Sequence, residues 1–157
     1  MNHQIEPIII EAEIPSKVDD VFKWFTSGFS KWWPREYTWS QEKLVTIGIE
    51  MKVGGRCTEL GPNNFQIDWG RVTAFDSLNK VELAWQISPS RVPQPDPDNA
   101  SRVTVIFEPI ETNLTKVKLH HDRFENHGEG CKEYRDALGS DFGWPYILSK
   151  FKEACVA

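Results

Sequence analysis

Histidine is the residue of this chain whose type and position best suit chemistry on an apolar surface. His121 follows Val117 and Leu119 at intervals of two residues, so an extended chain places all three on one face. A histidine there can be a hydrogen-bonded core residue, a polar anchor in a cavity or a general base. No serine or cysteine stands beside it in a nucleophile motif, so the sequence assigns no catalytic residue.

Arginine supplies a second candidate, at the end of another apolar row. Arg71 alternates with Ile67 and Trp69, which predicts a shared strand face. A buried guanidinium needs a partner. Three outcomes remain open: Arg71 lies on the surface beside core tryptophans, pairs with Glu59, or meets an anionic or carbonyl group of a ligand.

The remaining polar clusters do not predict a metal or phosphate site. His120, His121 and Asp122 are consecutive, so they point alternately to opposite faces of a strand and cannot converge. His127 joins them only if the chain folds back, and we expect neither a metal ion nor a cofactor. The segment 54–56 (Gly-Gly-Arg) lacks the lysine and the following helix of a phosphate loop. It favours a bend in a sheet instead.

Tryptophan is unusually frequent, with seven in 157 residues. Each adds a large apolar area and one N–H that needs a partner, so the set can fill a core or line a pocket. Trp85 shares a predicted strand face with Val81 and Leu83, which indicates a covered position. Trp32 and Trp33 follow the first predicted helix, where they could gate a cavity or cover the end of the sheet.

Strands make up most of the elements that must position these side chains. Residues 5–14 predict a first strand, and Ser16 is the expected cap of the helix that follows. Val18, Val21 and Phe25 recur at helical spacing in that helix. Polar turns then separate further strand-like segments, at residues 44–53, 55–61, 65–75, 80–87, 102–109 and 114–122.

Helical and loop segments complete the pattern. Residues 29–35 predict a short helical turn, and a short helix is expected near 132–138. Residues 140–154 predict the last and longest helix, with an apolar face. Four prolines between residues 88 and 101 indicate a long exposed loop, a position where functional rims are common.

Length, charge and cysteine content exclude several classes. The 157 residues suit one domain spanning residues 1–157. A net charge of −5 without a basic block disfavours nucleic acid as a partner. The apolar runs are too short to span a membrane, and the N-terminal six residues lack the features of a secretion signal. Three widely spaced cysteines favour reduced thiols and a cytoplasmic location.

The order of the elements predicts an α+β fold. Consecutive strands joined by short turns pair antiparallel. The final helix is available to cover the apolar face of the sheet. We therefore expect a curved antiparallel sheet of six or seven strands around a long C-terminal helix, with two short helices after the first strand.

Several short strings, taken in order, resemble the SRPBCC superfamily, which has the START-like helix-grip fold of the birch-pollen allergen. Within it, the chain resembles the branch named for homology to the activator of heat-shock protein 90 ATPase. The strings are residues 15–25, 32–34, 54–56, 69–72, 81–85, 117–121, 124–128 and 143–144. One departure is Asp76-Ser77-Leu78, where the family often has two prolines. The resemblance implies an apolar cavity between sheet and final helix, used in relatives for lipids, polyketides or other small apolar molecules.

These observations predict a protein that binds a small apolar or lipid-like molecule between the sheet and the final helix, with access framed by Trp32-Trp33 and the 88–101 loop. The expected ligand-binding residues are Trp32, Trp33, Trp69, Arg71, Trp85, Phe107, His121, Ile147 and Phe151. Two alternatives stay open: a chaperone-linked interaction module, and a cyclase or hydrolase with His121 as acid–base. The sequence does not decide whether the chain forms a homodimer.

Overall fold

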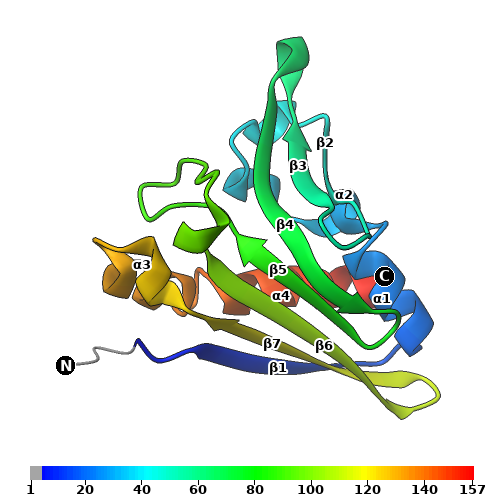
Figure 1. Ribbon diagram of the computed structural model, residues 1–157. Helices are drawn as coiled ribbons and strands as arrows, with labels where there is room; N and C mark the ends of the chain where they lie inside the picture. Colours follow the sequence, from blue (N-terminus) through cyan, green and yellow to red (C-terminus); the bar gives the residue numbers. More distant parts are fainter. Residues whose placement is uncertain (1–4) are drawn as a thin grey trace.

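One curled antiparallel sheet organises the protein (Figure 1). The computed structural model describes residues 5–157. Residues 1–4 lie outside the described part, and they include most of the N-terminal segment in which the sequence predicts no secretion signal. Within the described chain the sheet has seven strands in the order β1-β7-β6-β5-β4-β3-β2. They are β1 (Ile8–Ile14), β2 (Thr46–Ile49), β3 (Arg56–Leu60), β4 (Gln66–Asp76), β5 (Lys80–Trp85), β6 (Ser101–Glu111) and β7 (Leu114–Asp122).

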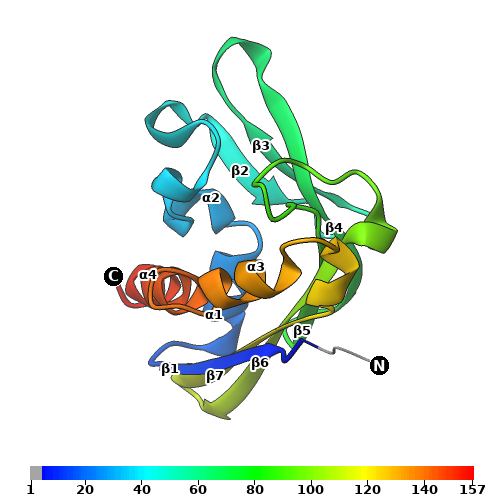
Figure 2. The same ribbon diagram turned by 90° about the vertical axis from the view of Figure 1, so that its left-hand side faces the viewer.

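The helices lie on the concave side of this sheet (Figure 2). They are α1 (Val18–Phe25), α2 (Phe29–Trp32), α3 (Cys131–Leu138) and α4 (Trp144–Val156). Two short helices thus follow the first strand, and the long C-terminal helix α4 lies within the curl. The predicted α+β helix-grip fold is confirmed.

Two helix starts differ from the sequence prediction. Helix α4 begins at Trp144 and not near residue 140, because the preceding residues form a turn in which the Gly143 N–H donates to the Ser140 carbonyl (2.9 Å). Ser16 does not cap α1. The cap position is Lys17, one residue later, and no side chain there bonds the helix. The Ser16 N–H instead closes a turn with the carbonyl of Ile14 (2.8 Å).

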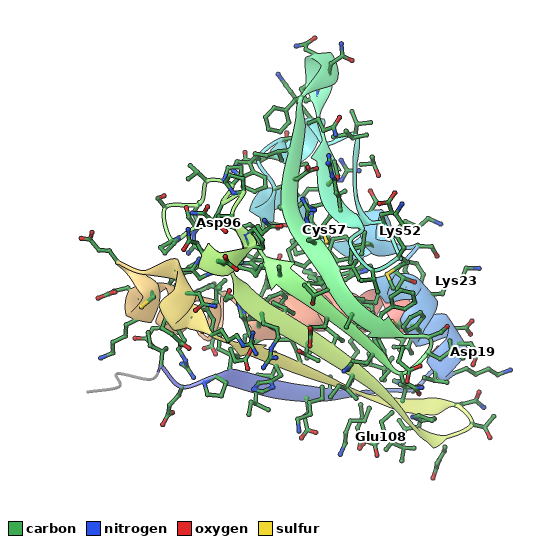
Figure 3. All side chains as sticks on the ribbon, viewed as in Figure 1. Asp19, Lys23, Lys52, Cys57, Asp96 and Glu108 are labelled. Carbon is green, nitrogen blue, oxygen red and sulfur yellow. The ribbon has the colours of Figure 1, made fainter. Side chains whose placement is uncertain are left out.

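Apolar side chains fill the concave side. Val81, Leu83 and Trp85 are all buried, as the alternation predicted. They belong to one continuous cluster that also contains the apolar face of α4. Charged side chains gather at the periphery, including the labelled Asp19, Lys23, Lys52, Asp96 and Glu108 (Figure 3).

A bulge in β4 decides which side chains enter this core. Cys57 of β3 pairs with Gly70 and the next residue pairs with Asp68, so Trp69 has no partner in the ladder. The extra residue interrupts the alternation. Trp69 therefore turns into the core with 2% exposure. Arg71 pairs with Ala84 of β5, which points to the opposite face from its buried neighbour Trp85, so Arg71 lies on the face away from the core. The expectation that Trp69 and Arg71 share a face is wrong for this reason.

Gly70 makes the bulge sterically feasible, which gives a test. A Cβ atom there would lie 2.8 Å from the backbone oxygen of Ala84 and 3.3 Å from Sγ of Cys57. We expect Gly70→Ala to lower the free energy of unfolding by about 1–3 kcal/mol in urea denaturation, because neither neighbour is a flexible chain end.

Gly48 in β2 is the matched control. A Cβ atom at this position would meet nothing within 4 Å. Gly48→Ala should therefore leave stability unchanged or raise it by about 0.5 kcal/mol, since alanine restricts the unfolded chain. Equal stability of Gly70→Ala and the wild type would contradict the role assigned to the bulge.

Candidate functional site

A cavity of about 560 Å³ opens at the N-terminal end of α4. Three segments form its walls: residues 33–41 after α2, the end of β5 with the loop that follows it, and residues 134–147 from α3 to α4. Most of the lining is aromatic or aliphatic. Its principal members are Trp33, Trp39, Trp85, Tyr134, Phe142 and Ile147.

The hollow between α4 and the centre of the sheet is, by contrast, filled. Only about 10 Å³ of free space remains there. Aromatic rings occupy the rest: Trp32 packs on Phe151 with 4.8 Å between ring centroids, and Phe25 on Phe107 with 5.7 Å. A ligand-sized volume therefore exists at one end of the helix and not beneath it.

The structure brings three of the nine expected ligand-binding residues to the cavity, namely Trp33, Trp85 and Ile147. Five others are buried without lining it, namely Trp32, Trp69, Phe107, His121 and Phe151. Arg71 lies on the other face of the sheet. A packed core and a pocket wall use the same side-chain types, so the sequence alone could not separate the two groups.

Tyr134 is a cavity residue that sequence reasoning missed. Its hydroxyl accepts the indole N–H of Trp85 (2.7 Å) and donates to the carbonyl of Ile87 (2.8 Å). Burial raises the pKa of this hydroxyl above its ordinary value, so it stays protonated and keeps donating. The pair fixes the Trp85 ring in the wall. The only sequence signal was the position of Tyr134 in a predicted short helix.

Glu59 holds another wall in place. Its carboxylate is fully buried and accepts the backbone N–H groups of Trp39 (3.1 Å) and Ser40 (2.8 Å). These two charge-assisted bonds fix the segment 38–41, which lines the cavity. Glu59 therefore does not pair with Arg71, one of the outcomes left open by the sequence.

His121 stands in a buried chain of hydrogen bonds. The Trp144 indole N–H donates to its Nδ1 (2.9 Å), which leaves the proton of a neutral ring on Nε2. Nε2 then donates to Oγ of Ser101 (2.7 Å), and this hydroxyl donates to Nε2 of His127 (2.8 Å). Ser101 lies 20 residues away in sequence, so the alternation of β7 gave no sign of the chain.

The surroundings of His121 oppose an acid–base role. The side chain is fully buried and does not line the cavity. Burial, followed by the nearby His127 and His120, holds the pKa of His121 well below its ordinary value. Both ring nitrogens are already bonded. We therefore assign His121 to the anchoring of α4 on β7.

The described residues hold no group of three or more histidine, cysteine or acidic side chains suited to a metal ion. No helix among residues 5–157 has the length and apolar character to cross a membrane.

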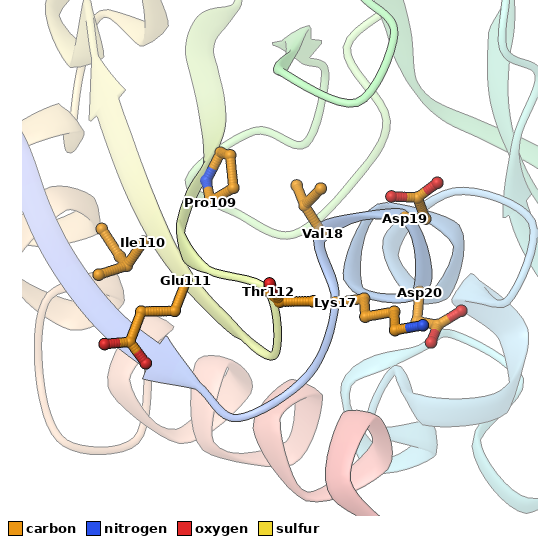
Figure 4. Close-up of a pocket in the computed structure, with 8 residues that line it drawn as sticks. All are labelled: Lys17, Val18, Asp19, Asp20, Pro109, Ile110, Glu111 and Thr112. Carbon is orange, nitrogen blue, oxygen red and sulfur yellow. The ribbon is translucent and has the colours of Figure 1, made fainter.

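A separate open groove of about 720 Å³ lies between the start of α1 and the β6–β7 turn (Figure 4). Its lining is Lys17, Val18, Asp19, Asp20, Pro109, Ile110, Glu111 and Thr112. It lacks the aromatic walls typical of a small-molecule pocket.

The curled sheet, the enclosed helix and the cavity at its end define the helix-grip class, a polyketide cyclase-like fold that commonly binds small molecules. Within this class the chain belongs to the family described as "Activator of Hsp90 ATPase homolog 1-like protein", whose model matches residues 15–155. The resemblance read from the sequence is confirmed. No curated protein matches the chain.

Solved structures share the fold. An anthrahydroquino-γ-pyrone synthase, Txn09, is 28% identical with a TM-score of 0.68, over 98% of this chain and 99% of the other. The self-sacrificing resistance protein CalC from Micromonospora echinospora is 26% identical with a TM-score of 0.65, over 98% and 96%. An AHSA1-like protein from Aeromonas hydrophila is 18% identical with a TM-score of 0.60, over 94% and 90%.

The histidine chain predicts a loss of stability on acidification. Burial lowers the pKa of His127 to about 4, and that of His121 is lowered as well. Between pH 6.5 and pH 4 these histidines become protonated in the unfolded chain but stay neutral in the folded protein. The free energy of unfolding therefore falls as the pH falls. We expect the two histidines to account for a loss of about 1–3 kcal/mol, measured by urea denaturation at a series of pH values.

Replacing His127 with glutamine should make this pH dependence shallower, because one of the two groups no longer titrates. Asn126→Ala is the control, since it removes a neighbouring hydrogen bond to the Ala100 carbonyl (3.0 Å) without removing a titratable group. It should lower stability equally at every pH. A His127→Gln variant with the wild-type pH dependence would contradict this assignment.

Proposed function

We propose that this protein binds a small molecule with a planar aromatic or otherwise apolar body in the cavity at the N-terminal end of α4. The observation that carries the proposal is the cavity itself, about 560 Å³ with mainly aromatic and aliphatic walls. Ligand pockets typically enclose about 300–1,000 Å³ behind apolar walls with a few placed polar groups. The proposal keeps the ligand class expected from the sequence and moves its position to the end of the helix.

The walls are preformed, which favours binding. The Trp33 and Trp85 rings lie 6.5 Å apart between centroids, and Trp85 contacts Trp144 at 5.3 Å. Trp85 is only 4% exposed and its N–H is already bonded to Tyr134, so it lines the cavity with a small part of its ring and offers no free donor. Rings held in place lose little freedom on binding, and a stacked aromatic pair adds about 0.5–1.5 kcal/mol.

The synthase among the similar structures supports a planar ligand. Its name specifies an anthrahydroquino-γ-pyrone, which is a fused aromatic ring system. The two chains match over almost their whole lengths. We propose the same broad shape of ligand here, without carrying over the reaction.

A chaperone-linked role is the second candidate, and the family description favours it. It requires a contact surface for a chaperone and no ligand in the cavity. Stimulation of a heat-shock protein 90 ATPase by this protein, unchanged when the cavity is blocked, would favour this candidate over ligand binding.

The neutral fluorophore N-phenyl-1-naphthylamine tests the binding proposal. At about 0.4 kcal/mol per heavy atom, we expect a Kd on the order of 10 µM, measured by energy transfer from tryptophan to the bound probe. Ala137 is exposed on α3 and lines the cavity, so Ala137→Trp should block it and weaken binding at least about tenfold.

Glu133→Trp is the matched control. Glu133 is exposed on the same helix but does not line the cavity, so its replacement should leave the Kd within about twofold. The proposal would be wrong if the wild type did not bind the probe, or if the Ala137→Trp variant bound it as tightly as the wild type does.

A further inference from the structure

Arg91 is a cation in the cavity wall, in the proline-rich connection between β5 and β6. Its Cζ lies 4.6 Å from the centroid of the Tyr134 ring. A guanidinium stacked on a ring is oriented by that contact, while the N–H donors at its edges remain able to bond a partner in their plane. Among residues 5–157, no carboxylate lies within 4 Å of it.

The backbone holds Arg91 in an unfavourable conformation. Its φ is +65°, in the left-handed region that favours glycine or asparagine. The turn is closed by hydrogen bonds from the Arg91 N–H to the Ser88 carbonyl (2.8 Å) and from the Ser88 N–H to the Val92 carbonyl (2.8 Å). The Trp39 indole N–H also donates to the Arg91 carbonyl (3.0 Å). These bonds hold the Arg91 backbone in place at the rim of the cavity.

The other charge in the wall is already engaged. Oε2 of Glu36 accepts the hydroxyl of Tyr146 (3.0 Å). Lys150 lies over the Tyr146 ring, with Nζ 5.4 Å from its centroid, so a cation stands beside this pair. In the described part of the wall, Arg91 is the cation available to a ligand.

We propose that Arg91 selects ligands whose planar body carries an anionic oxygen, such as a carboxylate, phenolate or sulfonate. The inference rests on the proposed function of the same cavity and adds the chemical class of the ligand. The anionic oxygen accepts the edge N–H groups of Arg91, while the rings contact Trp85 and Trp33. Charge-assisted bonds of this kind are stronger than neutral ones.

Two probes that differ in one anionic group test this selection. 1-Anilinonaphthalene-8-sulfonate has the skeleton of N-phenyl-1-naphthylamine plus a sulfonate, so the ratio of their dissociation constants isolates the anion. We expect Arg91→Asn to weaken binding of the sulfonate roughly tenfold and to leave the neutral probe within about twofold. Arg91→Lys should restore part of the loss, because it keeps the charge without the planar donor geometry.

Two further variants make the result specific. Arg56→Asn changes the net charge equally at an exposed position outside the cavity, and should leave the probe ratio unchanged. Ala137→Trp should block both probes. Asparagine tolerates the left-handed conformation, so Arg91→Asn should fold with undiminished stability, which urea denaturation checks.

The outcomes separate the two proposals. If the neutral probe binds and Arg91→Asn leaves the ratio unchanged, the anion selection is wrong while the binding function stands. Sulfonate binding that persists in both Ala137→Trp and Arg91→Asn is surface binding and also overturns the selection. If neither probe binds the wild type, the binding function fails and the selection fails with it.

Discussion

The hydrogen bond from the Trp144 indole to His121 fixes the first turn of α4 against β7, and the position of the cavity depends on it. Trp144 is the first residue of the helix, so the chain from α3 must arch over its end to reach it. The arch is tight. A Cβ atom at Gly143 would lie 2.1 Å from the Leu138 carbonyl oxygen, so only glycine fits. Leu138, Phe142 and Gly143 then become one wall of the cavity.

Aromatic volume determines how much room remains inside the curl. Rings from α1, α2 and α4 interlock with those of the sheet, and close the hollow beneath α4 to about 10 Å³. The open volume therefore lies where the loops, and not the sheet, supply the walls.

Buried polar groups give these loop walls a defined position. The Glu59 carboxylate fixes the segment 38–41, and the Tyr134 hydroxyl joins Trp85 to the loop after β5. Because a buried polar group without a partner is costly, each of these contacts favours one arrangement of the wall over others. Arg91 extends the same construction to the rim, where its stacking on Tyr134 orients the guanidinium.

The sequence by itself determined most element types, the antiparallel pairing of consecutive strands and the inward side of β5 and β7, because the period of two follows from the pleat of an extended chain, which is local in sequence. It also placed His121 on the buried face. Only the tertiary structure decided that a bulge places Trp69 and Arg71 on opposite faces of the sheet. It also decided that His121 bonds Ser101 and that the free volume lies at the end of α4. A bulge depends on how two strands pair, and a void is the space left between side chains of distant segments. Neither quantity is a property of any one stretch of sequence.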